Sequence, residues 1–245
     1  MNTITIITAT YNSEKTIRDT IDSVLSQSYN DIEYIIVDGY SKDKTISIIQ
    51  SYGSRIKYIS EPDKGVYDAI NKGLRMANGD YVLVLGSDDM LYDNKCIEHI
   101  VSEMHEKSNV YYGNVLWKGT NHVHWGRFNK LKWAWSNISH QALFYPKTVY
   151  KTHDYELKYR IYADNVYNLK LLKEGIKFSY IDQIVTLYAM EGLSSNLKDA
   201  CFDEDRNRLI YEALGLIPLC VFHAHQLLIK CKKIARWIAK PFVLA

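Results

Sequence analysis

The stretch Tyr81-Val-Leu-Val-Leu-Gly-Ser-Asp-Asp89 joins five apolar or aromatic residues to two adjacent carboxylates. A short apolar run that ends in polar residues predicts a buried strand of a parallel sheet. In open α/β sheets, ligands bind beyond the carboxyl ends of the strands. An unpaired carboxylate beside a hydrophobic core is costly. Asp88 and Asp89 therefore predict a divalent cation that bridges to the diphosphate of a ligand.

The first ninety residues alternate between strand-like and helix-like segments with short connections. We expect strands over residues 3–10, 32–37, 56–60 and 81–85. Helices are expected between them, with Ser13 and Ser41 as caps of the first two and residues 65–77 as the third. Such repetition implies a largely parallel, Rossmann-like sheet with right-handed crossovers and helices on its faces.

The pattern changes after Asp93. Residues 109–118 and 122–128 alternate like antiparallel strands, and residues 178–189 read as a further strand. Helices are expected over residues 94–106, 146–153, 161–174, 197–214 and 218–240. We therefore expect one domain over residues 1–195, made of a nucleotide-type half (1–93) and a mixed half (94–195). Residues 196–245 would form a C-terminal helical extension.

Composition narrows the class of protein. A chain of 245 residues that is 47% hydrophobic and 24% charged is an ordinary folded protein. Its four cysteines lack zinc or CxxC spacing, which predicts free thiols in a reducing compartment. The opening sequence has no basic segment of the kind that precedes a secretory signal. We expect a cytoplasmic protein without a nucleic-acid partner.

Polar and aromatic residues follow the first two predicted strands. Thr10, Tyr11 and Asn12 end the first strand, and Glu14 is close behind. Tyr11 could stack on a base while Asn12 reads the edge of that base. Asp38 ends the second strand, where a carboxylate can accept hydrogen bonds from a uracil N–H or ribose hydroxyls. A plain strand-to-helix turn, and a turn-forming Asp-Gly pair, explain the two motifs equally well when each is taken alone.

The third predicted strand is followed by Asp63 and Lys64, which open a helix. This position would place Lys64 and the amides of the helix N-terminus near a phosphate. Asp68 and Asn71 lie one helical turn apart, so both can face the same cleft. A proline-containing turn and a solvated helix face are the simpler alternatives.

The four motifs lie at the carboxyl ends of four different predicted strands, which randomly placed surface carboxylates have no reason to do. Together they indicate a ligand site, and they resemble the motifs of family 2 glycosyltransferases. The segments that carry the resemblance are Ala9-Thr-Tyr-Asn12 with Glu14, Val37-Asp-Gly-Tyr-Ser-Lys-Asp-Lys-Thr45, Ser60-Glu-Pro-Asp-Lys-Gly-Val-Tyr-Asp-Ala-Ile-Asn-Lys-Gly73 and Gly86-Ser-Asp-Asp89. The resemblance is dense over residues 3–93 and sparser up to about residue 190.

The resemblance implies a GT-A fold, in which a mostly parallel α/β sheet carries a smaller antiparallel acceptor-side part. Residues 1–93 would then be the nucleotide-sugar half of the domain, and residues 94–195 its acceptor half. It also implies an inverting enzyme that moves a hexose or N-acetylhexosamine from a nucleoside diphosphate sugar, with UDP as the expected nucleotide. Mn²⁺ or Mg²⁺ is the implied cofactor. The branch whose second motif reads Asp-Gly is often found in bacterial polysaccharide clusters, which suggests O-antigen, capsule or exopolysaccharide assembly.

The resemblance also assigns residues. Four of them match nucleotide-binding positions of the family: Thr10, Asn12, Glu14 and Asp38. The metal motif usually reads Asp-X-Asp followed by another acid, but here Gly86 replaces the first Asp. One carboxylate contact to ribose or metal is therefore missing. Asp88 becomes the better candidate for metal, and Asp89 is expected to contact the metal or the donor sugar.

The later half must supply a general base. The segment Arg160-Ile-Tyr-Ala-Asp-Asn-Val-Tyr167 resembles the one that carries the family's catalytic carboxylate, which points to Asp164. An inverting transfer needs such a carboxylate to take the proton of the attacking hydroxyl. A favourable dipole partner at a helix start is the alternative. His140 and Gln141 resemble residues on the acceptor and donor-sugar side, although His140 packed beneath the sheet is nearly as plausible.

The C-terminal segment differs in charge from the rest of the chain. Residues 206–245 contain seven of the 30 Lys and Arg residues but one of the 28 Asp and Glu residues. An apolar stripe of Leu227, Cys231, Ile234 and Ile238 is opposed by basic residues, which is typical of an interfacial helix. We expect peripheral contact with the inner face of the cell membrane and a lipid-linked oligosaccharide acceptor. A terminal helix packed on the domain is the alternative, and a homodimer is possible from sequence.

Two other functions remain open. The replacement of an acid by Gly86 also fits a non-catalytic nucleotide- or glycan-binding subunit that supports a partner transferase. A nucleotidyltransferase would share a similar sheet. The absence of a Gly-rich loop with Arg or Lys after the first strand argues against it.

Overall fold

The computed structural model describes residues 2–124, 126–189 and 198–238, with side chains described as far as Lys232. A nine-stranded sheet runs through the molecule in the order β3-β2-β1-β4-β8-β6-β9-β5, with β7 paired to β6. Its first half consists of β1 (Ile4–Thr10), β2 (Ile32–Asp38), β3 (Lys57–Ser60) and β4 (Tyr81–Val84). These four strands are parallel, as the sequence predicts.

Helices cover both faces of this half, which explains why β1, β2 and β4 are mostly buried, whereas the edge strand β3 is largely exposed. Alternate residues of β2 belong to two separate cores: Ile35 and Val37 to one, Tyr34 and Ile36 to the other. The first core includes α3 (Val66–Met76), and the second includes α1 (Ile17–Leu25) and α2 (Thr45–Gln50). A short 3-10 turn, η1 (Gly53–Arg55), leads into β3.

The second half of the sheet mixes directions. The expected antiparallel pair is confirmed as β6 (Val110–Trp117) and β7 (Val123–His124), and β9 (Phe178–Tyr188) runs parallel to β6. Sequence analysis did not predict β5 (Met90–Leu91) or β8 (Leu143–Pro146) as strands. Yet β8 lies between β4 and β6 and pairs antiparallel with both. It therefore joins the two halves into one sheet.

Two predicted helix caps are wrong. The first helix begins after Thr16 and the second after Lys44, and neither has a side-chain cap. The Ser13 hydroxyl lies 2.9 Å from the Ser87 hydroxyl, and Ser41 donates its hydroxyl to Asp38. Both hydroxyls bind between loops at the carboxyl edge of the sheet, so they are not available to helix amides.

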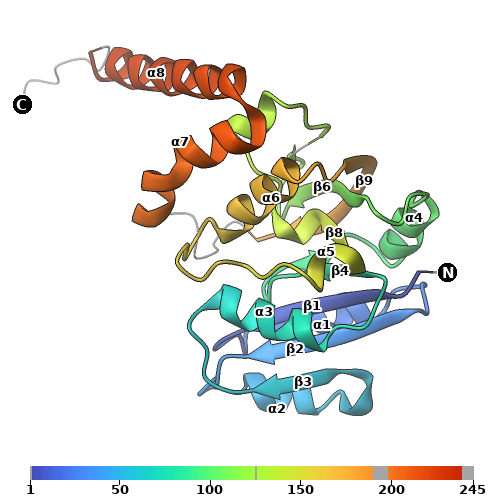
Figure 1. Ribbon diagram of the computed structural model, residues 1–245. Helices are drawn as coiled ribbons and strands as arrows, with labels where there is room; N and C mark the ends of the chain where they lie inside the picture. The colour runs from blue at the N-terminus through green and yellow to red at the C-terminus, as the bar shows by residue number, and fades with distance from the viewer. Residues whose placement is uncertain (1, 125, 190–197, 239–245) are drawn as a thin grey trace, which may run out of the picture.

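Five helices belong to the second part of the chain. They are α4 (Cys96–Ser102), α5 (Lys147–Tyr150), α6 (Ala163–Lys173), α7 (Ala200–Leu214) and α8 (Leu216–Ile238), with short turns η2 (Lys132–Ala134) and η3 (His140–Ala142). Figure 1 shows α7 and α8 at the end of the molecule opposite β3 and α2. Among the described residues no helix has the length and apolar character needed to cross a membrane. The predicted boundary between residues 195 and 196 lies outside the described residues.

Candidate active site

The carboxyl ends of the first three strands form one row of polar residues. In the strand register, Thr10 is paired with Asp38, and Asp38 with Ser60. Asp38 is fully buried and accepts hydrogen bonds from Ser60 Oγ (2.7 Å), the Ser41 amide (2.9 Å) and the Ser41 hydroxyl. Its carboxylate therefore holds the loop that follows β2. Sequence reasoning missed Ser41 and Ser60, whose only signal is a hydroxyl just beyond a strand end.

Asn12 and Glu14 bind the same loop from the neighbouring strand end. Asn12 Oδ1 accepts from the Lys42 amide (2.8 Å), and Glu14 Oε2 accepts from the Lys44 amide (3.0 Å). The Asn12 amide in turn donates to Ser41 Oγ (2.8 Å), with Asn12 in the left-handed region at φ 51°. Two of the predicted nucleotide contacts thus hold the loop after β2 in this structure.

Thr10 and Tyr11, at the end of β1, differ in exposure. The Thr10 hydroxyl is buried and has no hydrogen-bond partner among the described residues, while Tyr11 is 61% exposed. A Cβ added at Gly39 would lie 2.5 Å from Asp63 Oδ2 and 3.4 Å from the Tyr11 ring. Gly39, Asp63 and Tyr11 follow three different strands and therefore lie close together at this point. An exposed ring next to an unpartnered buried hydroxyl is suited to hold a planar base.

The start of α3 is organised by its own acids. Asp63 Oδ1 accepts from the Gly65 amide (2.8 Å), and Asp68 Oδ2 accepts from the Lys64 amide (3.0 Å). Asn71 is different, because it is only 3% exposed and pairs with the backbone of Tyr155. Its amide donates to Tyr155 O (2.9 Å), and its Oδ1 accepts from Tyr155 N (2.8 Å). Asn71 therefore joins α3 to the acceptor half, with both ends of its amide occupied.

Asp89 is buried and held by the acceptor half. Its Oδ1 accepts from the Ala189 amide (2.8 Å) at the end of β9, and its Oδ2 accepts from Gln141 Nε2 (2.9 Å). Burial raises the pKa of Asp89 to about 6; the charge of Asp88 adds to this rise, and the two hydrogen bonds oppose it. Asp89 thus joins its own segment to η3 and to the end of β9, although burial disfavours its negative charge.

Gly86 makes this arrangement possible. A Cβ at this position would lie 2.5 Å from Asp89 Oδ2 and 3.0 Å from Asp88 Oδ1. The departure from the usual acid therefore leaves the space that the Asp89 carboxylate fills. Asp88 itself is half-buried, and no side chain or amide of the described residues donates a hydrogen bond to it. Within the same residues, no cluster of three or more His, Cys, Asp or Glu side chains is placed to hold a metal.

The predicted base lies next to this motif. Asp164 is in the first turn of α6 and is 9% exposed, and its Oδ1 accepts from the Asn165 amide (2.7 Å). Its Oδ2 lies 3.5 Å from His140 Nδ1, which has no hydrogen-bond partner among the described residues. Because Gln141 binds Asp89, consecutive residues of η3 contact the metal motif and the predicted base. The structure thus brings Asp89, His140, Gln141 and Asp164 together.

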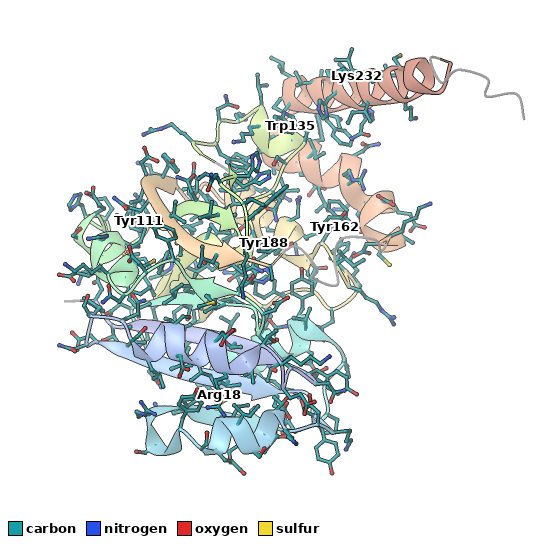
Figure 2. All side chains as sticks on the ribbon, turned by 180° about the vertical axis from the view of Figure 1, so that it is seen from behind. Arg18, Tyr111, Trp135, Tyr162, Tyr188 and Lys232 are labelled. Atoms are coloured by element: carbon teal, nitrogen blue, oxygen red, sulfur yellow. The ribbon has the colours of Figure 1, made fainter. Side chains whose placement is uncertain are left out.

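Buried tyrosines surround Asp164. The hydroxyl of Tyr67 donates to Ile161 O (2.6 Å), and its ring stacks on Tyr155 at 5.3 Å. Burial, followed by the nearby charge of Asp164, holds the pKa of Tyr67 well above its usual value. Figure 2 shows Tyr162 and Tyr188 between the first half of the sheet and the C-terminal helices, close to where α6 begins and β9 ends. The site therefore lies where the two halves meet.

Acids and polar side chains thus gather beyond the carboxyl ends of the strands, where α/β enzymes bind their ligands. The sequence model of the family described as "Glycosyl transferase family 2" matches residues 5–175. The chain belongs to this family and is a glycosyltransferase, which confirms the relationship expected from its motifs.

Individual relatives agree with this assignment. A "PGL/p-HBAD biosynthesis glycosyltransferase" of Mycobacterium bovis is 33% identical over 207 residues, covering 80% of this chain and 81% of the relative. An uncharacterized glycosyltransferase of Rickettsia typhi is 39% identical over 117 residues, covering 46% of this chain and 36% of the relative.

Solved structures confirm the GT-A fold. S. aureus TarS in complex with UDP-GlcNAc has a TM-score of 0.67 at 22% identity and covers 84% of this chain and 65% of that one. The chain spans 42% of the length of a longer TarS structure. A mannosyltransferase from Pyrobaculum calidifontis, in complex with GDP-Man and Mn²⁺, has a TM-score of 0.65 at 15% identity over 98% of this chain and 81% of its own.

Proposed function

We propose that the chain catalyses the inverting transfer of a hexose or N-acetylhexosamine from a UDP-linked sugar to a hydroxyl of a lipid-linked glycan. The observation that carries the proposal is the unbroken series of contacts along the carboxyl edge of the sheet. Asp38 holds the loop beside Asn12, the Ser13 and Ser87 hydroxyls join β1 to the metal motif, and Gln141 joins that motif to residue 140 beside Asp164. The complex of TarS with UDP-GlcNAc supports a UDP-linked donor.

Asp164 is the proposed general base. One carboxylate oxygen is held by the Asn165 amide, so the other is left to accept a proton. The proton of the acceptor hydroxyl passes to Asp164 as its oxygen attacks the anomeric carbon. The bond from that carbon to the diphosphate breaks on the opposite face, and the electron pair leaves with the diphosphate. His140, 3.5 Å from the same carboxylate, lines the approach of the acceptor.

Asp88 is the residue that fits a divalent cation. Sites for Mg²⁺ and similar ions commonly use one or two carboxylates together with substrate phosphates and water. Asp88 meets that need, because it is half-buried and receives no hydrogen bond from the part of the chain that the structure describes, whereas both oxygens of Asp89 already accept hydrogen bonds. Mn²⁺ or Mg²⁺, when bound, supplies positive charge that stabilises the leaving diphosphate. We therefore assign Asp88 to the metal and Asp89 to the alignment of the motif.

The uridine would lie at the other end of the edge. Tyr11 is the ring on which the base stacks, and it follows Thr10, whose buried hydroxyl has no partner among the described residues. Asp63 and Lys64 lie at the start of α3, where helix amides attract phosphate. Asn12, Glu14 and Asp38 would act by holding the loop in place. We leave Asn71 out of the donor site because its amide is occupied by Tyr155.

The exposed side of α8 supports contact with a membrane. Leu227 and Leu228 are 62% and 60% exposed, whereas Phe222 on the packed side is 6% exposed. Lys230 and Lys232 are exposed close to these leucines, and Figure 2 shows Lys232 on the part of α8 that extends away from the body. Leucines flanked by lysines suit an anionic leaflet, where each basic residue contributes about 1 kcal/mol. Ile234 and Ile238 of the predicted stripe fall outside the described side chains.

The transfer itself is tested with a panel of nucleotide sugars. We expect metal-dependent release of UDP from one of them, and a loss of this release with EDTA. Asp164→Asn should lower turnover by about 100- to 10,000-fold while nucleotide affinity is unchanged. The matched control is Asp154→Asn, because Asp154 is exposed and paired with Arg75. Full turnover in the Asp164 variant removes it as the base, and no turnover of any donor by the wild type favours a binding subunit.

The membrane contact has its own test. Replacing Leu227 and Leu228 with Glu should release the protein from anionic vesicles in a sedimentation assay. Val123→Glu serves as control, because Val123 is also exposed, at 48%, on a different part of the molecule. Equal sedimentation of both variants would refute the anchoring role of α8.

A further inference from the structure

One buried carboxylate connects the C-terminal helices to the segment before α6. Asp199 is 5% exposed and is the N-cap of α7, where its Oδ1 accepts from the Phe202 amide (3.2 Å). Its Oδ2 accepts from the amides of Ile161 (2.9 Å) and Tyr162 (3.3 Å). The same side chain therefore satisfies amides of two chain segments 38 residues apart. A carboxylate that binds several backbone amides is a strong and well-oriented contact.

The segment that Asp199 binds leads directly to the proposed base. Tyr162 is the residue before α6, and Asp164 follows in the first helical turn. The ring of Tyr162 stacks on Phe202 of α7 at 4.7 Å, and Ile161 O accepts from Tyr67 of α3. Residues 161 and 162 are thus held from α3 on one side and from the start of α7 on the other. Their position sets the direction in which α6 begins.

Part of the remaining contact between α6 and α7 is formed by exposed ion pairs around a cavity. A cavity of about 270 Å³ lies between these helices and the preceding segment, with charged residues along its wall. Around it, Lys173 pairs with Glu212 and Lys158 with Asp205, and the two lysines are 54% and 50% exposed. Exposed ion pairs of this kind contribute little. Apolar side chains such as Leu169 of α6 and Leu209 of α7 pack in the same buried core, and Asp199 is the buried polar contact that reaches the segment before α6.

We propose that Asp199 is a positioning residue for Asp164, so that the C-terminal helices complete the catalytic site. The proposal rests on the role of Asp164 as the base. Reacting groups must be held close to their productive geometry, and a displacement of about 1 Å can lower a rate by about 100-fold. Loss of the contact to residues 161 and 162 would let the first turn of α6 move, without a change at the nucleotide end of the cleft.

The variant Asp199→Asn separates the two roles of this side chain. Asparagine is as good a helix cap as aspartate, so one oxygen can still accept from Phe202. The other oxygen becomes an NH2 group, which cannot accept from Ile161 or Tyr162. We expect a fall in kcat of about 10- to 100-fold, with the donor KM and UDP affinity within about twofold. Asp205→Asn is the matched control, because Asp205 also belongs to α7 and also binds the segment before α6, through Lys158 and Tyr159.

Amide hydrogen exchange gives a second measurement that does not need turnover. In Asp199→Asn the amides of residues 161–165 should exchange faster than in Asp205→Asn. If Asp199→Asn does not fold, Asp199→Ser keeps a cap with a shorter reach and replaces it in both assays. Unchanged exchange at 161–165, or equal kcat losses in the Asp199 and Asp205 variants, overturns the proposal. A wild-type protein that turns over no donor refutes the proposed function instead, and exchange then still decides whether Asp199 holds this segment in place.

Discussion

Two carboxylates, the half-buried Glu33 and the buried Asp89, lie at opposite ends of the same sheet and have opposite pKa shifts. Glu33, near the amino end of β2, accepts from Lys57 Nζ (2.7 Å), Thr5 Oγ1 (2.6 Å) and the Asn78 amide (2.8 Å). Burial alone would raise its pKa, but these hydrogen bonds outweigh burial and lower the pKa to about 2. At the carboxyl end, burial wins for Asp89 and raises its pKa to about 6.

The difference in pKa separates an acid that stabilises the fold, Glu33, from an acid at the candidate active site, Asp89. Glu33 has a cation and several donors, so its charge is stabilised within the fold. Asp89 has two neutral donors and a neighbouring carboxylate, Asp88, so its charge is compensated only in part. Sites that bind cations or perform chemistry commonly contain such strained charges. The comparison therefore suggests which end of the sheet evolved for stability and which for ligand binding.

The largest expected effect is on turnover. Asp89→Asn can accept from only one of its two donors, so either Gln141 or Ala189 loses its contact and the motif shifts. We expect turnover to fall by about 100-fold, measured as UDP release under steady-state conditions. Glu33→Gln should leave turnover within about twofold at temperatures where it is folded. Equal losses in both variants would remove the distinction between the two ends.

The second effect is on stability as a function of pH. The pKa of Glu33 is about 2 in the fold and 4.5 ordinarily. Its contribution to the free energy of unfolding is therefore present above pH 4.5 and lost as the pH falls through 2. For Asp89 the dependence on pH is reversed, because its pKa rises from 3.8 to about 6 on folding. Its contribution to the free energy of unfolding is therefore lost as the pH rises through 6.

Urea unfolding from pH 7 down to about pH 2 tests both signs, because the Glu33 effect changes below pH 4.5 and the Asp89 effect between pH 4 and pH 6. Glu33→Gln should be less stable than the wild type by about 2–3 kcal/mol at pH 7. The advantage of the wild type over Asp89→Asn should fall by about 2–3 kcal/mol from pH 4 to pH 7. A wild-type advantage over Asp89→Asn that grows with pH would show that the Asp89 carboxylate is fully compensated.

Two glycines give a smaller test of the same contrast. A Cβ at Gly79 would lie 2.7 Å from Thr3 O and 2.8 Å from Thr5 N, beside the Glu33 network, where backbone atoms cannot yield easily. Gly79→Ala should therefore lower the free energy of unfolding by about 1–3 kcal/mol and leave turnover unchanged. Gly86→Ala meets the movable Asp89 carboxylate, so it should cost about 1 kcal/mol or less and lower turnover by about tenfold. The reverse pattern would contradict the assignment.

The smallest effect concerns Lys57, whose ammonium group pairs with Glu33 at the amino end of the sheet. Lys57 has 61% of its side chain exposed and pairs with Glu33. Its replacement by Gln should cost about 0.5–1 kcal/mol and raise the pKa of Glu33, because one of its donors loses its charge. Proton titration by NMR measures this pKa. A loss of several kcal/mol would mean that Lys57, and not the set of neutral donors, holds Glu33 in place.

Much of the nucleotide-sugar half, residues 1–93, could be predicted from sequence. An apolar run followed by Asp88 and Asp89 defines a buried strand and its ligand end, and three further strand ends with polar residues repeat the pattern. What sequence could not provide is the partner of each side chain. Whether Asn12 faces a base or the amide of Lys42 depends on the path of a loop that begins 26 residues later.

The acceptor half was harder for the same reason. Strand β8 has four residues and no alternation, so its place between β4 and β6 is set by tertiary pairing. Asp199 looks like an ordinary helix cap in sequence, and its contact with Ile161 depends on the way α7 folds back onto α6. Asp164 was predictable only through its motif, because a lone acid at a helix start is common.

The insertion of β8 limits how new enzymes can be built from this scaffold. Because β8 pairs with β4 on one side and β6 on the other, a cut between residues 93 and 94 would divide a hydrogen-bonded ladder. A chimera that exchanges acceptor specificity should therefore keep residues 139–146 with the first half of the chain, so that Gln141 stays matched to Asp89. Crossover points chosen by chain order alone would separate residues that form one layer in space.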